Sequence, residues 1–332
     1  MATLGANNLT LVDMAKRMDP DGKPAKIAEL LEQSNPVLKD MTWIEGNLPT
    51  GHRCTIRTGL PTVAWRLYNQ GVAPSKSTTA QVDEQCGMLE SLSVVDSKLA
   101  ALNGNTSGFR LQEATSFVEA MAQEKAQTLF YGNSALNPEE FTGLSIRYSD
   151  LSAANAQNII DAGGTGSDNS SVWLICWRPD KITGIYPKGS TMGLDHKDLG
   201  EDLVFDATGI AGASFLALRD MWSWNCGLAV CDWRYAVRIA NIDISNLVAK
   251  SSAADLIEEM IKAMHVIPDL TVGKCAFYMN RTCFQMLDIQ RYDNAAAAGL
   301  TYFDVDGHLM PTFRGIPVRT VDQLTETEAQ VT

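Results

Sequence analysis

The sequence contains no long apolar run. No stretch approaches the ~20 consecutive apolar residues that a helix needs to span a bilayer. The N-terminal stretch MATLGANNLTLVDMAKRMDPDGK also lacks the basic segment followed by an apolar segment that marks a secretory signal. We therefore expect a soluble protein with no membrane partner.

Basic residues are outnumbered in this chain. It has 27 Lys and Arg against 39 Asp and Glu, which gives a formal net charge of −12. Because neutralisation of phosphates by clustered Lys and Arg dominates nucleic-acid affinity, this balance disfavours a protein that grips DNA. It is compatible with a protein that encloses DNA without sequence-specific binding, since such a protein gains from not adhering to it.

Signatures of catalysis and of cofactor binding are also lacking. The four histidines are scattered and form no H-E-x-x-H motif. The glycine-rich run 163–168 lacks the third glycine of a dinucleotide loop and leads into a strand, so a tight connector is expected. Neither a Walker G-K-[ST] motif nor a G-x-S-x-G elbow occurs. We therefore expect no enzyme, no cofactor and no metal.

The cysteines are odd in number and show no disulfide-like spacing. This pattern predicts reduced thiols in a protein made in a cytoplasm. Cys226 and Cys231 could suggest zinc, but in one continuous strand their separation places them on opposite faces, so small core residues are favoured. The seven cysteines are Cys54, Cys86, Cys176, Cys226, Cys231, Cys275 and Cys283.

The length of 332 residues exceeds the usual size of one compact core and indicates about two domains. Residues 1–48 are predicted to form an arm, with a short amphipathic helix at 24–34 that cannot bury itself. Residues 52–57, 62–68 and 88–95 are β-like runs, typical of a long hairpin that is marginal alone. Arm and hairpin should therefore rest on something else, in this chain or a neighbour.

The clearest helix is predicted at 111–131, where Phe117, Met121 and Leu129 fall near one face. From residue 170 onward β-like segments dominate, beginning with SVWLICW and ITGIYP. The C-terminal part adds a strand that leads into a short helix, and a hairpin turn at Asp306-Gly307.

A long strand is predicted from Phe215 to Asn241. The apolar phase reverses at Gly227, so a bulge or break is expected there. In its second half Arg238 falls on the polar face, opposite the apolar positions. The helix predicted next, at 252–265, should have Ser251 or Ser252 as its N-cap.

Four aromatic residues gather in the predicted long strand: Trp222, Trp224, Trp233 and Tyr235. A stacking platform for sugars or bases would need accessible rings and, for nucleic acid, basic neighbours. Because the nearby arginines fall on the opposite strand face, packing of the aromatic side chains in the core is the favoured interpretation.

Two long sequence blocks resemble the major capsid proteins of tailed bacteriophages with the HK97 fold. They are IIDAGGTGSDNSSVWLICWRPDKITGIYPKGSTMGLDHKDLG and WNCGLAVCDWRYAVRIANID, across residues 158–243. Segments 111–148 and 313–324 extend the likeness, which covers most of the chain and is closest to a group common in short-tailed phages.

This resemblance implies an α+β HK97-like capsid fold. Its parts would be an N-terminal arm (1–48), an extended E-loop hairpin (49–100), a peripheral domain with a long spine helix (101–165), a mainly axial domain (166–300) and C-terminal strands returning to the core (301–332). The implied contacts between subunits are Leu11, Val12, Leu30 and Leu31 on the arm, and Arg53, Arg57, Trp65 and Arg66 on the E-loop.

The chain departs from the better-known branch of that fold. There the Gly-x-Pro-Val strand, here 315–318, is followed by a further strand pair, whereas this sequence ends at Thr332. Residues 173–187 look like that pair, so we hypothesise a rearranged strand order with this segment inside the central sheets. Lys76 lies where cross-linking relatives place a lysine, but a solvated side chain is the favoured interpretation.

The implied function is that of a structural, non-enzymatic major capsid protein. It would self-assemble into hexamers and pentamers of an icosahedral phage head enclosing double-stranded DNA, in the host cytoplasm, and become the virion capsid. No scaffold-like helical extension precedes the arm. The expected partners are therefore further copies of the chain, a separate scaffolding protein and a portal, with a cement protein as a further candidate.

Two alternatives remain open. An encapsulin-like compartment would share the fold, and only packaged cargo or gene neighbours would distinguish it. A sugar-binding β-rich module built on the aromatic residues would instead be monomeric or a small oligomer.

Overall fold

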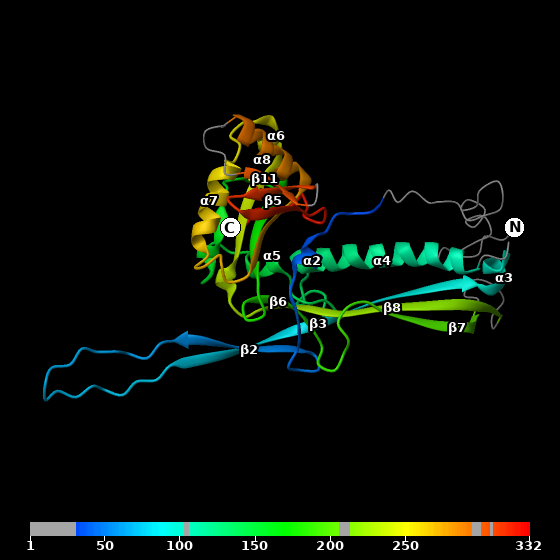
Figure 1. The fold of residues 1–332 in the computed structure, drawn as a ribbon, viewed down its shortest axis with the longest axis horizontal. Coiled ribbons are helices and arrows are strands. Elements are labelled where there is room, and N and C mark those ends of the chain that lie inside the picture. The colour runs from blue at the N-terminus through cyan, green and yellow to red at the C-terminus, as the bar shows by residue number, and fades with distance from the viewer. Residues whose placement is uncertain (1–30, 103–105, 206–212, 294–299, 306–307) are drawn as a thin grey trace. The chain divides into compact units, whose positions relative to one another are not determined.

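The computed structural model describes residues 31–102, 106–205, 213–293, 300–305 and 308–332. The α+β chain divides into two units. The first contains Met1–Gln33, Met88–Lys125 and Gly193–Asn225, and the second contains the remainder. Strands β3 (Thr78–Asp96) and β8 (Ser214–Val230) and helix α4 (Thr106–Tyr131) each contribute to both units (Figure 1).

The first unit packs helix α4 on strand β8. Phe117 of the helix stacks on Trp222 of the strand, with ring centroids 5.2 Å apart. Arg110 donates hydrogen bonds to both carboxylate oxygens of Asp220, at 2.6 and 3.0 Å. Helix α3 (Ser97–Ala100) precedes α4, and strand β7 (Asp195–Phe205) pairs antiparallel with β8. The predicted helix 111–131 is confirmed and begins earlier, at Thr106.

The second unit is built on a mixed sheet. Along the described chain the strand order is β11-β12-β13-β10-β5-β6-β8-β3-β2, with β1 beside β6, and β9 beside β4 and β5. The strands not yet given are β1 (Trp43–Glu45), β2 (Gly51–Gly59), β4 (Ile159–Asp161), β5 (Asn169–Trp177), β6 (Ile182–Tyr186), β9 (Ala236–Asp243), β10 (Lys274–Met279), β11 (Leu300–Val305), β12 (His308–Phe313) and β13 (Ile316–Thr320).

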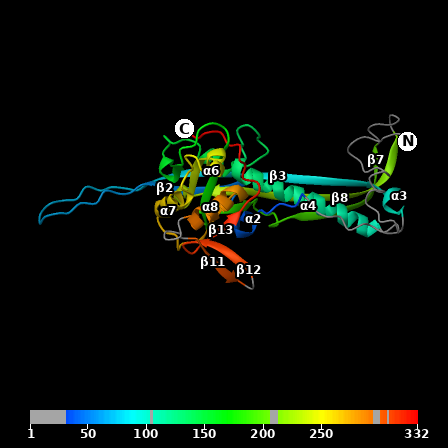
Figure 2. The same ribbon diagram turned by 90° about the horizontal axis from the view of Figure 1, so that it is seen from above.

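Short helices complete the second unit. They are α2 (Val37–Asp40), α5 (Leu144–Arg147), the 3₁₀ turns η2 (Ala156–Asn158) and η3 (Trp233–Tyr235), and then α6 (Ile244–Ala249), α7 (Leu256–Val266) and α8 (Arg281–Asp293). Helices α6 and α7 contact β9, and α8 contacts both helices, so the three lie together (Figure 2). None of the helices described is long and apolar enough to cross a membrane.

Strand β5 forms the centre of the core. All nine of its residues are buried, because it is flanked by β10, β6 and β9 in the sheet and covered on both faces. A strand with two covered faces reads as a continuous apolar run, as SVWLICW does. The predicted strands at SVWLICW and ITGIYP are therefore confirmed as β5 and β6, and both lie in the central sheet, as the rearrangement hypothesis requires.

A buried ion pair joins the C-terminal segment to this sheet. Arg238 of β9 and Glu328 have side chains that are 5% and 6% exposed, and their charged atoms are 2.8 Å apart. Arg238 also donates to the Ser171 hydroxyl at 2.9 Å and to the Tyr148 carbonyl at 2.8 Å. Glu328 accepts from Ser171 and, at 2.6 Å, from the Tyr131 hydroxyl. The two charges are thus almost fully hydrogen-bonded, as burial requires.

Two expectations about strands are wrong. Residues 62–68 form no strand, because the facing segment is rich in Gly, Pro and Ser and offers no pairing partner. Strand β8 continues through Gly227, where a Cβ would lie 2.5 Å from the Gln85 carbonyl oxygen, so the glycine permits a close strand approach rather than a bulge. The break comes instead at the η3 turn.

The expected N-cap of the helix at 252–265 is also corrected. Helix α7 is capped by Asp255, whose side chain accepts from the backbone N–H groups of Ile257 and Glu258. Ser252 has φ +52° and belongs to the preceding turn. The hairpin of β11 and β12 is confirmed by its antiparallel pairing, although residues 306–307 lie outside the described chain. The described end of the predicted arm helix, 31–34, is not helical.

The expectation of seven reduced thiols is wrong for four of them. The structure pairs Cys54 with Cys231 and Cys176 with Cys275 as disulfides. Cys176 and Cys275 are directly opposite each other on β5 and β10. The partners are 177 and 99 residues apart in the chain, so no local spacing could indicate either pair.

Replacing Glu328 with Gln tests the buried ion pair, because it removes the charge and keeps the size of the side chain. We expect the free energy of unfolding of the subunit to fall by about 3–5 kcal/mol, since Arg238 is left buried without a counter-charge. Urea-induced unfolding followed by circular dichroism measures the change.

The matched control is Arg281→Ala. Arg281 pairs with Asp322 at 2.5 Å, but its side chain is 69% exposed. We expect little change in stability, because solvent screens the exposed guanidinium and the Ser34 N–H still donates to Asp322, whose side chain is 14% exposed. Equal losses in the two variants would contradict the role given to burial.

Candidate assembly surfaces

The hairpin of β2 and β3 carries an exposed apolar tip. Residues 60–77 have no regular strand, and every one of them is exposed (Figure 1). The side chains of Val63, Trp65 and Tyr68 are 89%, 104% and 95% exposed. A monomeric soluble protein seldom exposes contiguous large apolar groups, and such a patch marks an interaction surface. We call residues 60–77 the hairpin tip.

Charged residues flank this tip. Arg53 donates to both carboxylate oxygens of Asp83 across the strand pair, at 2.6 and 2.7 Å. The hydrogen bond from Arg53 lowers the pKa of Asp83. Arg57 and Arg66 are exposed, and within the described residues neither makes an ion pair. Arg53 therefore forms a solvent-exposed ion pair across the two strands, while Arg57 and Arg66 present positive charge to solvent.

The base of the hairpin is fixed by a second ion pair. Glu84 of β3 accepts from both terminal nitrogens of Arg147 in α5, at 2.7 and 2.6 Å. The Glu84 side chain is 6% exposed and that of Arg147 is 20% exposed. The pair could not be predicted from the sequence, because a charged side chain in a β-like run such as that of Glu84 indicates the solvent face of a strand, and Arg147 is 63 residues away.

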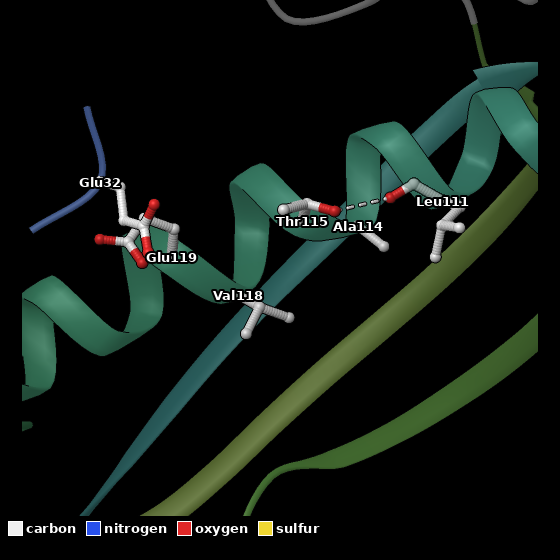
Figure 3. A pocket seen from close by; sticks show the side chains of 6 residues that line it. All are labelled: Glu32, Leu111, Ala114, Thr115, Val118 and Glu119. Carbon is white, nitrogen blue, oxygen red and sulfur yellow. Dashed lines mark hydrogen bonds between the residues drawn. The ribbon is translucent and has the colours of Figure 1, made fainter. Parts of the chain in front are cut away.

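Helix α4 carries a mostly apolar depression next to the end of the arm (Figure 3). Its lining comes from Glu32 and from Leu111, Ala114, Thr115, Val118 and Glu119. The end of the arm is hydrogen-bonded beside it, because the Gln33 N–H donates to Glu119 at 3.0 Å and the Gln123 amide donates to the Leu31 carbonyl at 2.7 Å.

The candidate contact residues fall in three places. Leu31 is 81% exposed beside α4, and Leu11, Val12 and Leu30 lie outside the described residues. Arg53 and Arg57 are on β2. Trp65 and Arg66 are in the hairpin tip.

The four aromatic residues do not form one platform. Trp222 and Tyr235 are buried, at 3% and 6% exposed, and they belong to different units. The ammonium of Lys125 lies 3.3 Å from the centroid of the Trp224 ring. Core packing is thus confirmed for Trp222 and Tyr235.

Potential metal ligands come together at one place in the described chain, where His52, Cys54 and Cys231 meet. Cys86 packs against Cys54, Ile185 and Ala229 beside it. Burial, with a smaller effect from Cys226, raises the pKa of the Cys86 thiol to about 12. Cys86 is therefore a neutral thiol at ordinary pH.

The fold and its exposed hairpin are those of an HK97-like capsid subunit. The structure matches that of bacteriophage Epsilon15 with a TM-score of 0.79 and 34% identity, over 100% of both chains. The chain belongs to the family described as Major capsid protein GP7, whose model matches residues 19–332. It is therefore a phage major capsid protein, a structural component of the virion that assembles with its own copies into a shell.

Other matches are weaker. The bacteriophage JBD30 capsid is 11% identical, with a TM-score of 0.49 and coverage of 90% of this chain and 93% of that one. An encapsulin complex from Synechococcus elongatus PCC 7942 is 12% identical, with a TM-score of 0.44 and coverage of 71% and 97%. No curated protein matches it.

Replacing Arg147 with Ala tests the base of the hairpin. Glu84 would keep its burial but lose its charged hydrogen-bond partner, a loss of about 1.5–3 kcal/mol. We expect backbone amides of β2 and β3 near Glu84 to exchange with deuterium about ten- to a hundredfold faster. Mass spectrometry of peptides from this region measures the rates.

Arg53→Ala is the control on the same hairpin, because its pair with Asp83 is exposed on both sides. We expect unchanged exchange at those amides. Faster exchange of the same size in this variant would argue against a special role for the buried pair.

Proposed function

We propose that the subunit forms the hexamers and pentamers of an icosahedral head that encloses double-stranded DNA. The exposed hairpin tip is the observation that carries this proposal. Its apolar side chains would be shielded only by another molecule, and in a shell of identical subunits the nearest partner is a second copy. The net charge of −12 supports enclosure of DNA without sequence-specific binding.

The proposed parts of the subunit follow its sequence. Residues 1–48 act as the arm, 49–100 as the E-loop, 101–165 as the peripheral domain with the spine helix, 166–300 mainly as the axial domain, and 301–332 as strands returning to the core. Three of these assignments have direct support. The hairpin projects an unpaired tip, α4 is long, and the C-terminal segment joins the sheet through Glu328.

Two contacts between subunits are proposed. Trp65 would fill an apolar site on a neighbouring copy, while Arg53, Arg57 and Arg66 meet its acidic surface. Leu11, Val12, Leu30 and Leu31 of the arm would cover apolar surface such as the depression on α4, in this subunit or in a neighbour. Both contacts pair an exposed apolar group with an apolar surface, the main favourable term in protein association.

Assembly is proposed to take place in the host cytoplasm and to need further proteins. These are a separate scaffolding protein, a portal and, as a further candidate, a cement protein. The role of the chain itself is structural and not catalytic. An encapsulin-like compartment is the distant alternative.

Replacing Trp65 with Ala tests the proposed E-loop contact. An aromatic anchor at an interface contributes about 2 kcal/mol or more, and a closed ring repeats the loss at every contact. We expect most subunits to remain unassembled, as measured by size-exclusion chromatography and negative-stain electron microscopy. The free energy of unfolding of the isolated subunit should change by no more than about 0.5 kcal/mol, because the side chain is solvated.

The matched control is Trp65→Phe, which keeps an apolar ring and should assemble nearly as the natural chain does. If Trp65→Ala lowered subunit stability and assembly together, Trp65 would belong to the fold of the subunit and the contact would be rejected. Normal assembly of Trp65→Ala would reject it as well.

A further inference from the structure

Three side chains with metal-binding atoms meet at the base of the hairpin. His52 and Cys54 are two positions apart on β2 and therefore point to the same face of the strand. Cys231 follows the end of β8. The ligand atoms of the three residues all lie within 4.8 Å of one another. No local sequence pattern indicates this group, because Cys54 and Cys231 are 177 residues apart in the chain.

The surroundings hold these side chains in place. Cys54 is 4% exposed and packs with Ile185 and Ala229. The backbone N–H of Cys231 donates to the Lys181 carbonyl at 2.8 Å. The Nδ1 atom of His52 is buried, and among the described residues it has no hydrogen-bond partner. A buried polar atom without a partner costs free energy, so a ligand on this nitrogen would be favourable.

The spacing of the group suits a tetrahedral cation. Zinc binds Cys sulfur at ~2.3 Å and His nitrogen at ~2.0–2.1 Å, which places the ligands about 3.5–3.8 Å from one another. Side-chain movements of about 1 Å would bring atoms that lie within 4.8 Å to those separations. Two thiolates and one imidazole form a donor set that zinc prefers, with water as the fourth ligand.

We propose that, once reduced, His52, Cys54 and Cys231 bind a divalent cation of the zinc class, and that the Cys54–Cys231 disulfide is the oxidised, metal-free state of the same site. This inference goes beyond the capsid function. It depends on the arrangement of β2 and β8 and not on hexamers or pentamers.

The two states interconvert by balanced chemistry. Two molecules of a small thiol reduce the disulfide, so that each cysteine sulfur gains one electron and one proton and the reductant leaves as its own disulfide. The cation then displaces the two thiol protons and binds two sulfurs and the imidazole. A small-molecule disulfide reverses the redox step after the metal leaves.

Either state ties the same two strands together. The disulfide joins β2 covalently to the residue that follows β8, and the metal would join them through coordinate bonds. The base of the hairpin is thereby fastened in both reducing and oxidising surroundings, while the tip stays unpaired. The link at the base of the hairpin therefore depends on redox state: it is a disulfide under oxidising conditions and a metal site under reducing conditions.

Cobalt(II) is a suitable probe, because thiolate ligands give it charge-transfer absorption in the near ultraviolet. The full chain is reduced under anaerobic conditions, separated from the reductant and titrated with Co²⁺ and then with Zn²⁺. We expect one equivalent of Co²⁺ per subunit with that absorption, displaced by Zn²⁺. The oxidised chain should show none.

Variants identify the ligands. His52→Gln retains both cysteines and should still form the disulfide, but it should bind Co²⁺ at least about tenfold more weakly, since even outer partners of metal ligands are worth that much. Cys54→Ser should lose most of the absorption. Cys275→Ser disrupts the other cysteine pair and should leave Co²⁺ binding unchanged.

Three outcomes would overturn the proposal. One is the absence of thiolate absorption in the reduced natural chain. Another is equal affinity for Co²⁺ in His52→Gln and the natural chain, which would leave only a cysteine pair. The last is an equal loss in Cys275→Ser, which would place the metal at β5 and β10 instead.

Discussion

The ion pair of Arg238 and Glu328 is the contact on which the body of the subunit depends. Both side chains are nearly inaccessible to solvent, and the pair connects β9, β5, the end of α4 and the C-terminal segment through Ser171 and Tyr131. A buried pair contributes little net stability compared with apolar packing, but its members tolerate only one arrangement of partners. Its main effect is therefore to fix where the C-terminal segment meets the sheet. The mutual backbone hydrogen bonds of Asn169 and Glu328 follow from that placement.

The hairpin differs from the body in leaving large apolar side chains exposed to solvent. In the body, polar groups find partners inside the chain and apolar groups are covered, as all nine residues of β5 show. In the hairpin tip, Trp65 and Tyr68 have no cover at all. Such exposure is unfavourable for an isolated molecule and is tolerable when another copy covers the same groups. The sequence thus separates a body whose polar and apolar groups find their partners within the chain from a tip whose apolar groups are exposed. This separation is the physical basis of a shell subunit.

Sequence patterns predicted elements whose signal is local. Helix α4 follows from its apolar spacing, and β5 and β6 from short apolar runs bounded by turn residues. Contacts between distant segments could not be predicted. Arg238 was predicted on the polar face of its strand but is buried. Its burial is possible because Glu328, 90 residues later in the chain, pairs with it. The same holds for Glu84 with Arg147 and for Cys54 with Cys231. The contact residues on the hairpin were predicted from the family resemblance, because composition alone marks the hairpin only as poorly buried.

A rigid base and an unpaired tip are complementary requirements. In the proposed contact the tip binds a neighbouring subunit. It can reach the same position in every subunit only if the strands that carry it are held rigidly at their base. Glu84, Arg147 and the Cys54–Cys231 link hold those strands where they enter the sheet. The net charge of −12 acts in the same direction, since like-charged subunits repel one another at random orientations. In the proposed assembly the positive and apolar groups of the tip must meet a matching surface, so specificity comes from geometry and from suppression of wrong contacts as much as from affinity.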